Sequence, residues 1–327
     1  MTTGNKVNRG WLSSLSLCVM LASASVTSNA ATRIELDWQS PLSEDHPLVG
    51  TIHANRLPIS FEDLVQQMAS ARHILIGEKH DNHDHQQLEV RLLKALNEHN
   101  AEHGKTMAVV FEMLDASQQK NIDAMTTALA DNADLELSME QMKADLDWPE
   151  QGWTWEDYDN VIGWVLDNRV PMYAGNIDST QMQSVYRNGI DTEFTTAIEL
   201  REELEQPLLE QVYQGHCELM EKELLSPMVD IQLVKDAAMT NALLEADTDM
   251  SVLVAGTGHT RIDSAIPRHL QLGGDDTVMS VALVEVDPEL SSVTDYGVAD
   301  RFDVLIFTPV ANQRDYCADL EKSMEKH

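Results

Sequence analysis

Six short apolar runs constrain the fold of this chain more than any other feature of its sequence. Each is rich in Val, Ile and Leu and ends at or near Gly, Pro, Asn or Asp. Runs that are almost continuously apolar indicate strands buried on both faces, which is typical of parallel sheets. The six runs are HILIG (73–77), MAVVFEM (107–113), VPMYAGN (170–176), SVLVAGTG (251–258), VMSVALVEV (278–286) and FDVLIFTP (302–309).

Helical patterns lie between these runs. Ser60 and Asp63 give the segment SFEDLVQQMA a start that resembles a capping box. Leu88, Leu92 and Leu96 recur at a spacing of four residues and would line one face of a later helix. Because strands and helices alternate, we expect an α/β fold with a largely parallel sheet flanked by helices.

The segment from about 178 to 247 has no convincing strand pattern. After Pro227, the residues Ile231, Val234, Ala238 and Ala242 follow helical spacing. The sequence therefore predicts one α/β domain over residues 31–327, with a helical subdomain inserted at about 178–247.

The N-terminal residues predict a secretory signal peptide over residues 1–30. Lys6 and Arg9 precede an apolar run at 11–24 and the small-residue pattern Ser28-Asn29-Ala30. We therefore expect a periplasmic or secreted protein that is soluble after cleavage. A lipid anchor is not expected, because Leu17 stands before Cys18 where a lipoprotein signal has a small residue.

Charge and cysteine content restrict the partners and the compartment. A formal net charge of −33 argues against binding to nucleic acid or to an anionic membrane. Cys217 and Cys317 remain after the signal peptide, and in an oxidising compartment we expect a disulfide between them. The chain has no CxxC pair, so zinc-finger chemistry is excluded.

Ionisable side chains follow three of the predicted strands. Glu78 and His80 come after HILIG, Glu112 follows MAVVF, and His259 comes directly after SVLVAGTG. The carboxyl ends of parallel strands meet at one edge of a sheet, so these four side chains are expected to share a cleft. Either carboxylate alone could be a solvated strand end, but one that lies against a buried strand usually needs a partner.

Five blocks of the sequence together resemble a known family. They are ILIGEKHDNHDHQQLEVRLL, FEMLDASQQ, WPEQGWTWEDY, GHCELM and LVAGTGHTRIDSAIPRHL, and they extend over most of residues 50–310. In this order they resemble the ChaN-like haem-binding uptake proteins. Those proteins are grouped with the Tiki, TraB and erythromycin-esterase-like proteins in one superfamily.

The resemblance implies an α/β fold with a helical subdomain and binding of b-type haem in bacterial iron uptake. In the wider superfamily, the GExH motif, a glutamate on a following strand and a late GxGH histidine form a catalytic pocket. By motif position these are Glu78, His80, Glu112 and His259. The resemblance leaves open whether this pocket is active here.

The iron ligand implied by the resemblance is a histidine or a tyrosine. His216 and His269 are the leading candidates, and Tyr213 lies three residues before His216. His269 stands where the family pattern suggests a tyrosine. The alternative is that His216 only caps a helix beside the Cys217–Cys317 bridge.

These residues and the resemblance lead to two hypotheses about the function of the protein. The first is a periplasmic haem-binding protein in which two protomers could enclose the haem and outer-membrane haem-uptake machinery could be a partner. The second is an esterase- or metallopeptidase-like hydrolase, with His80 as general base and His259 stabilising negative charge. In one variant, His80 and His259 bind a divalent metal ion. A pure interaction protein with an acidic surface would not explain the residues at the strand ends.

Overall fold

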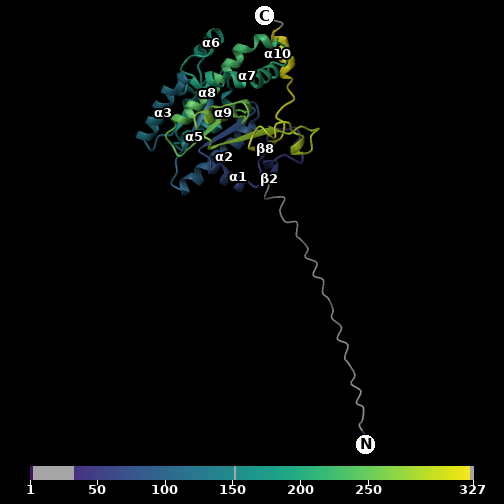
Figure 1. The fold of residues 1–327 in the computed structure, drawn as a ribbon. Coiled ribbons are helices and arrows are strands. Elements are labelled where there is room, and N and C mark those ends of the chain that lie inside the picture. Colours follow the sequence, from purple (N-terminus) through teal and green to yellow (C-terminus); the bar gives the residue numbers. More distant parts are fainter. Residues whose placement is uncertain (3–32, 151, 325–327) are drawn as a thin grey trace.

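The predicted strands assemble into one sheet of eight strands in the order β2-β1-β8-β7-β3-β6-β4-β5. The structure is a computed structural model that describes residues 1–2, 33–150 and 152–324 (Figure 1). Apart from residues 1 and 2, the predicted signal peptide therefore lies outside the described residues.

All six predicted strands are present and pair in parallel, which confirms the predicted fold class. They are β3 (His73–Glu78), β4 (Met107–Asp115), β5 (Met172–Asn176), β6 (Met250–Gly256), β7 (Val278–Glu285) and β8 (Val304–Thr308).

An antiparallel hairpin at one edge of the sheet was not predicted. It consists of β1 (Ile52–Ala54) and β2 (Leu57–Ile59), and β1 also pairs with β8. Asn55 and Arg56 form the loop with φ of 49° and 64°, in the left-handed region that a two-residue type I′ turn requires. Strands of three residues are too short to produce a recognisable apolar pattern.

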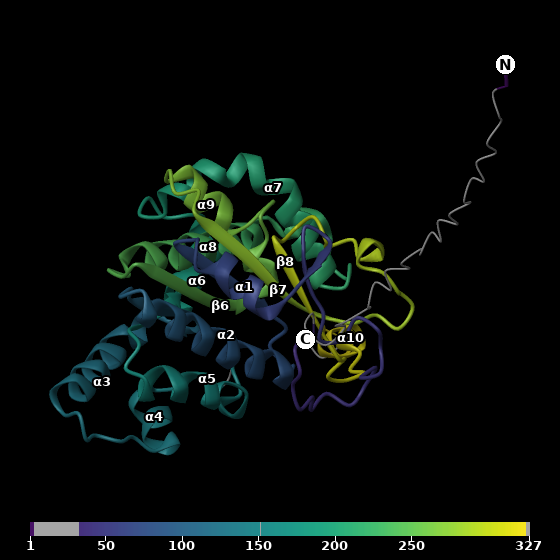
Figure 2. The same cartoon turned by 90° about the horizontal axis from the view of Figure 1, so that it is seen from below.

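Helices cover both faces of the sheet (Figure 2). On one face lie α1 (Phe61–Met68), α2 (His83–Glu102), α3 (Gln119–Asp131), α4 (Met139–Asp145) and α5 (Trp155–Asp167). The opposite side carries α6 (Ser179–Asn188), α7 (Thr195–Gly215), α8 (Ser226–Glu245) and α9 (Ile266–Leu272), and α10 (Tyr316–Met324) ends the described chain. Within the described ranges, no helix combines the length and the apolar character needed to cross a membrane.

The alternation of side chains along β3 explains why its sequence is continuously apolar. Ile74 and Ile76 pack in the core under α1 and α2, whereas Leu75 packs in the opposite core under α8 and α9. A strand buried on both faces needs apolar residues at every position.

Local signals placed the start of α1 and the buried face of α2 correctly. Ser60 and Asp63 form a complete capping box at α1. Leu88, Leu92 and Leu96 of α2 are fully buried, as their spacing predicted.

The predicted helical segment lies between β5 and β6 and contains α6, α7, α8 and a short 3-10 helix, Lys222–Leu224. It has an apolar cluster of its own, built from residues of all three α-helices. Met239 and Leu243 of α8 also pack against β3, β4 and β6. Through α8, the segment is therefore attached to the sheet.

A disulfide ties the C-terminal helix to the end of α7. The sulfurs of Cys217 and Cys317 lie 2.04 Å apart, as a bonded pair does, and the two residues are separated by 100 positions. No residue of α10 is buried. The covalent bond is therefore the main attachment of this helix, together with contacts such as that of Lys79 over the ring of Tyr316.

We expect the substitution Cys317→Ser to release α10 while the sheet stays folded. Amide hydrogen exchange should become faster over residues 316–324 and stay slow in β3, β4 and β6, because the buried core does not depend on α10. The surface variant Ser323→Ala is the matched control. Faster exchange throughout the sheet would contradict this assignment.

Candidate functional site

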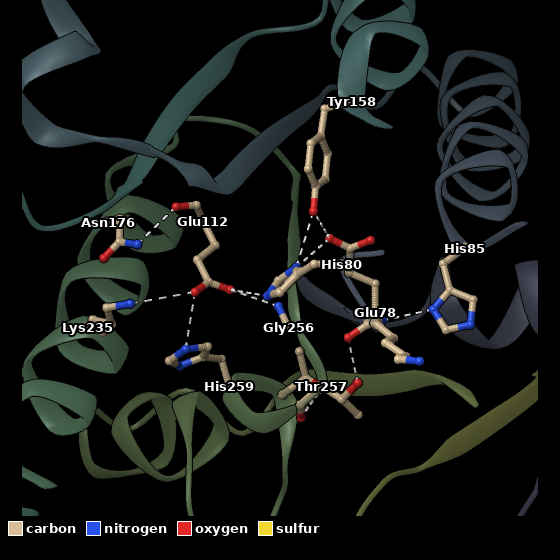
Figure 3. A network of polar contacts seen from close by, with 12 residues as sticks. Glu78, His80, His85, Glu112, Tyr158, Asn176, Lys235, Gly256, Thr257 and His259 are labelled. Atoms are coloured by element: carbon tan, nitrogen blue, oxygen red, sulfur yellow. Dashed lines mark hydrogen bonds and ion pairs between the residues drawn. The ribbon is translucent and has the colours of Figure 1, made fainter. Parts of the chain in front are cut away.

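The four predicted strand-end residues meet at one edge of the sheet (Figure 3). Glu78 ends β3, Glu112 lies in β4, and His259 follows β6 on a short 3-10 helix, Thr257–Thr260. β6 lies between β3 and β4, and all three run in parallel. Parallel order therefore brings these distant segments together, as expected.

Glu112 is the centre of the cluster. Its Oε1 lies 3.3 Å from His259 Nε2 and 3.9 Å from Lys235 Nζ. Its Oε2 accepts a hydrogen bond of 2.8 Å from the amide of Gly256 and lies 3.9 Å from His80 Nε2. Burial opposes ionisation, but the neighbouring histidines and Lys235 outweigh it and hold the pKa of Glu112 well below its usual range. The carboxylate is therefore charged, although its side chain is only 4% exposed.

Glu78 fixes the ring of His80. Its Oε1 accepts hydrogen bonds from His80 Nδ1 at 2.8 Å and from the Tyr158 hydroxyl at 2.6 Å, and its Oε2 accepts one from Gln86 at 2.5 Å. Burial lowers the pKa of His80, but the hydrogen bond and charge of Glu78 outweigh it, and the net shift is upward. The His80 side chain is 37% exposed, so this ring is the open part of the cluster.

His259 is held between two carboxylates. Its Nδ1 donates a hydrogen bond of 2.6 Å to Asp236, and its Nε2 faces Glu112. Burial lowers the pKa of His259, but the two carboxylates outweigh it and raise the pKa to about 10. His259 is therefore an imidazolium at neutral pH, and both of its ring nitrogens are occupied by protein groups.

Two further residues adjoin the cluster, Gly256 and Glu89. A Cβ on Gly256 would lie 2.8 Å from His80 Nε2, so only glycine allows the ring to lie over the end of β6. Glu89 is fully buried. Burial and then the charge of Glu78 raise the pKa of Glu89 well above its usual value.

Sequence reasoning missed Tyr158, Lys235 and Asp236. Tyr158 belongs to the tryptophan-rich block, whose aromatic rings were interpreted as packing. Lys235 and Asp236 are adjacent charges inside the apolar stretch IQLVKDAAM of α8. That interruption was a usable signal, because charges in a buried helix face need partners.

The two remaining histidines of the motif have different surroundings. His85 is fully buried, accepts a hydrogen bond from the amide of Lys79 at 2.9 Å and contacts the Thr308 hydroxyl at 2.9 Å. Burial lowers the pKa of His85 to about 3, so this ring is a neutral structural group. His83 begins α2 with its Nδ1 3.4 Å from Asp157.

In the part of the chain that the structure describes, no group of three or more His, Cys, Asp and Glu side chains is arranged to hold a metal ion. The ring nitrogens of His80 and His259 face carboxylates instead.

Two of the predicted haem ligands, Tyr213 and His216, lie in the helical segment. His216 follows α7, and its Nδ1 donates a hydrogen bond of 2.7 Å to the carbonyl of Val212. Tyr213 packs beside the apolar cluster of the segment, with Lys222 Nζ 4.4 Å from its ring centre. These two residues are part of the surface at the C-terminal end of α7.

His269 lies at the other end of α7. It is buried in α9, and its Nδ1 is 2.9 Å from the hydroxyl of Thr196. Burial lowers the pKa of His269 to about 4, so its ring is neutral. Thr196 and His216 are about 30 Å apart along the helix axis, so His269 and His216 cannot bind the same iron within one protomer.

An exposed tyrosine that the sequence reading did not consider lies on α6. Tyr186 is 50% exposed. It lines a hollow of about 310 Å³ together with Met182, Ile231 and Arg187. A phenol beside apolar side chains is a second arrangement that could hold a haem.

The family model described as haem-binding uptake, Tiki superfamily, ChaN matches residues 64–270. The chain belongs to this ChaN family. The match includes all four strand-end residues as well as Tyr213, His216 and His269. No curated protein matches the chain.

A solved structure of another ChaN protein shares the fold of this ChaN family member. ChaN of Campylobacter jejuni, solved with cofacial heme, is 24% identical with a TM-score of 0.64, over 78% of this chain and 94% of that chain. A mutant of the erythromycin esterase EreC is 11% identical with a TM-score of 0.45, over 79% and 95%. The type III effector HopBA1 is 11% identical with a TM-score of 0.41, over 76% and 92%.

We expect Asp236→Asn to lower the pKa of His259, because one of the two carboxylates that keep the ring charged is lost. The raised pKa stabilises the fold fully below the ordinary value of 6.5, and this contribution is lost as pH rises through about 10. In the variant, the loss should begin at lower pH. NMR titration of the His259 ring checks the shift, with the surface variant Asp263→Asn as control. An unchanged His259 titration would contradict this role of Asp236.

Proposed function

We propose that this protein binds haem outside the cytoplasm and handles it during iron uptake. The observation that carries the proposal is the family match over residues 64–270. The fold shared with a ChaN protein solved with cofacial heme supports it.

Export of the chain is part of the proposal. The basic residues, apolar run and small residues of the first 30 positions have the pattern of a cleaved signal peptide. The Cys217–Cys317 disulfide is consistent with an oxidising compartment such as the periplasm.

His216 is the axial ligand that we propose. A histidine that binds a metal usually donates its other ring N–H to a carbonyl or carboxylate, which fixes the tautomer and the ring orientation. The bond from His216 Nδ1 to the carbonyl of Val212 has this form and leaves Nε2 available. Haem bound there would supply the iron centre, and the protein would supply the ring nitrogen and an apolar surface.

Apolar side chains next to His216 fit a porphyrin face. Leu219 is 39% exposed and Leu224 is 60% exposed, so both offer apolar surface to a ligand. Lys222 lies in the same turn, where its ammonium group pairs with Glu210 at 2.6 Å. A second protomer enclosing the haem would bury these leucines, and we propose such a homodimer, with outer-membrane uptake machinery as a further partner.

We expect haemin added to the apoprotein to give a Soret band whose position depends on His216. His216→Ala should shift the band and weaken binding about tenfold or more, because the iron loses its protein ligand. Absorbance titration checks this. His269→Ala is the matched control, because that ring is buried and should leave the band unchanged.

Two further variants test the alternative ligands. If His216→Ala leaves both the band and the affinity unchanged, His216 is not the ligand. A band shift in Tyr186→Phe or Tyr213→Phe would then assign the iron to a phenol.

A second candidate function is hydrolysis at the strand-end cluster. The observation that favours it is the exposed ring of His80, whose Nδ1 is fixed by Glu78 while Nε2 lies free at 3.9 Å from Glu112. In this candidate, Nε2 takes a proton from water as general base. His259 has no free ring nitrogen, so we assign it to hold Glu112 in place.

If this site is active, hydrolysis of a neutral aryl ester should be lost in His80→Gln. The rate should rise with pH through the raised pKa of His80, because only the neutral ring accepts a proton. Glu78→Gln should move this rise to lower pH, since the carboxylate that raises the pKa is gone. Stopped-flow pH profiles check both, with His83→Gln as control.

Equal rates in wild type and His80→Gln would remove this candidate. Loss of activity with EDTA and recovery with Zn²⁺ or Mn²⁺ would instead support the metal-dependent variant.

A further inference from the structure

One hollow in the described structure lies outside both sites discussed so far. It has a volume of about 690 Å³, within the range of pockets that hold small organic molecules. Its apolar wall includes Leu283 of β7, Val298 and Phe302. No His, Tyr, Cys or Met is among the described residues that line it, so it offers no usual haem ligand.

One stripe of α7 closes this hollow. Pro207, Glu210, Gln211 and Gln214 line it and follow the i, i+3, i+4, i+7 spacing of a single helix face. Neither Tyr213 nor His216 belongs to that stripe. The hollow and the proposed haem surface therefore use different residues of α7 but adjoin each other, because Lys222 pairs with Glu210 and also lies over the Tyr213 ring.

The hollow is next to the strand-end cluster. Leu283 lies near the end of β7, which pairs in parallel with β3, the strand that ends at Glu78. Thr257 and Gly258, between β6 and His259, also line it. The Thr257 hydroxyl donates a hydrogen bond of 2.7 Å to the carbonyl of Glu78. Through this hydrogen bond, a residue that lines the hollow is joined directly to the backbone of Glu78 in the strand-end cluster.

The three acids that line the hollow are all bonded to cations. Asp263 is paired with Arg261 at 2.7 Å, Glu285 with Lys79 at 2.9 Å, and Glu210 with Lys222 at 2.6 Å.

Arg301 is the remaining cation of the lining. Among the described residues, no carboxylate lies within ion-pair distance of its guanidinium, and its charge acts on Asp263 only from further away. An unpaired arginine at the edge of an apolar hollow is a notable feature in a chain with a net charge of −33. A guanidinium binds carboxylates and phosphates with paired, charge-assisted hydrogen bonds.

We propose that this hollow binds an organic anion with an apolar body, whose charged group pairs with Arg301 and whose body lies against Leu283, Val298 and Phe302. The anion is a carboxylate or a phosphate monoester with a hydrocarbon chain or ring. The volume, the apolar wall and the unpaired cation all fit this class of ligand.

Isothermal titration calorimetry with dodecanoate tests the proposal. We expect saturable 1:1 binding that weakens about tenfold or more in Arg301→Gln, because one charge-assisted contact is lost. Arg187→Gln, which removes a surface charge on α6, is the matched control and should bind as wild type does. Dodecyl phosphate compared with dodecanoate identifies the preferred anion, and dodecanol should bind more weakly than either.

A second variant tests the location. Val298→Trp should fill the hollow and abolish dodecanoate binding while haemin titration and thermal unfolding stay unchanged. Equal affinity in wild type and Arg301→Gln, or no binding of either anion, would overturn the proposal. Loss of dodecanoate binding at haem saturation would overturn it too, because the hollow would then belong to the haem site. Haemin absorbance follows haem binding separately, so failure of one proposal is distinguishable from failure of the other.

Discussion

The buried carboxylate of Glu112 is the interaction on which the arrangement of the strand-end cluster depends. An ionised carboxyl group in a protein interior costs on the order of several kcal/mol unless charges and hydrogen bonds compensate it. Here the compensation comes from His259, Lys235, His80 and the amide of Gly256. These groups come from three separate segments, so the ionisation of Glu112 in β4 holds that strand, the end of β6, α8 and the loop after β3 in one geometry.

This arrangement explains why the helical segment cannot be regarded as an appendage. α8 supplies Lys235 to Glu112 and Asp236 to His259, and its apolar residues pack against the sheet at the same time. α7 packs against α8 through the second apolar cluster. One face of α7 closes the hollow beside the sheet, and its C-terminal end carries His216 and the disulfide. A ligand at either place would therefore contact a helix that is packed on the support of the strand-end cluster.

The proposed haem surface and the strand-end cluster differ in the kind of chemistry they offer. The surface at the end of α7 combines a histidine with a free ring nitrogen and two exposed leucines, which suits a large flat apolar ligand. The cluster combines one exposed imidazole with buried charges that hold it, which suits proton transfer. The two can coexist in one chain because they do not share residues.

Much of the architecture was determined by the sequence alone. The six strands, the capping box at Ser60 and Asp63 and the buried face of α2 could be predicted because each leaves a residue pattern within a short stretch of the chain. Parallel order was enough to predict that Glu78, His80, Glu112 and His259 meet. Only the tertiary structure showed which residues bond to these four side chains. Tyr158 and Asp236 come from distant helices, and the sequence around a buried charge does not indicate which distant residue pairs with it. The same reason applies to Arg301, whose lack of a partner is a property of the folded surface rather than of its neighbours in the chain.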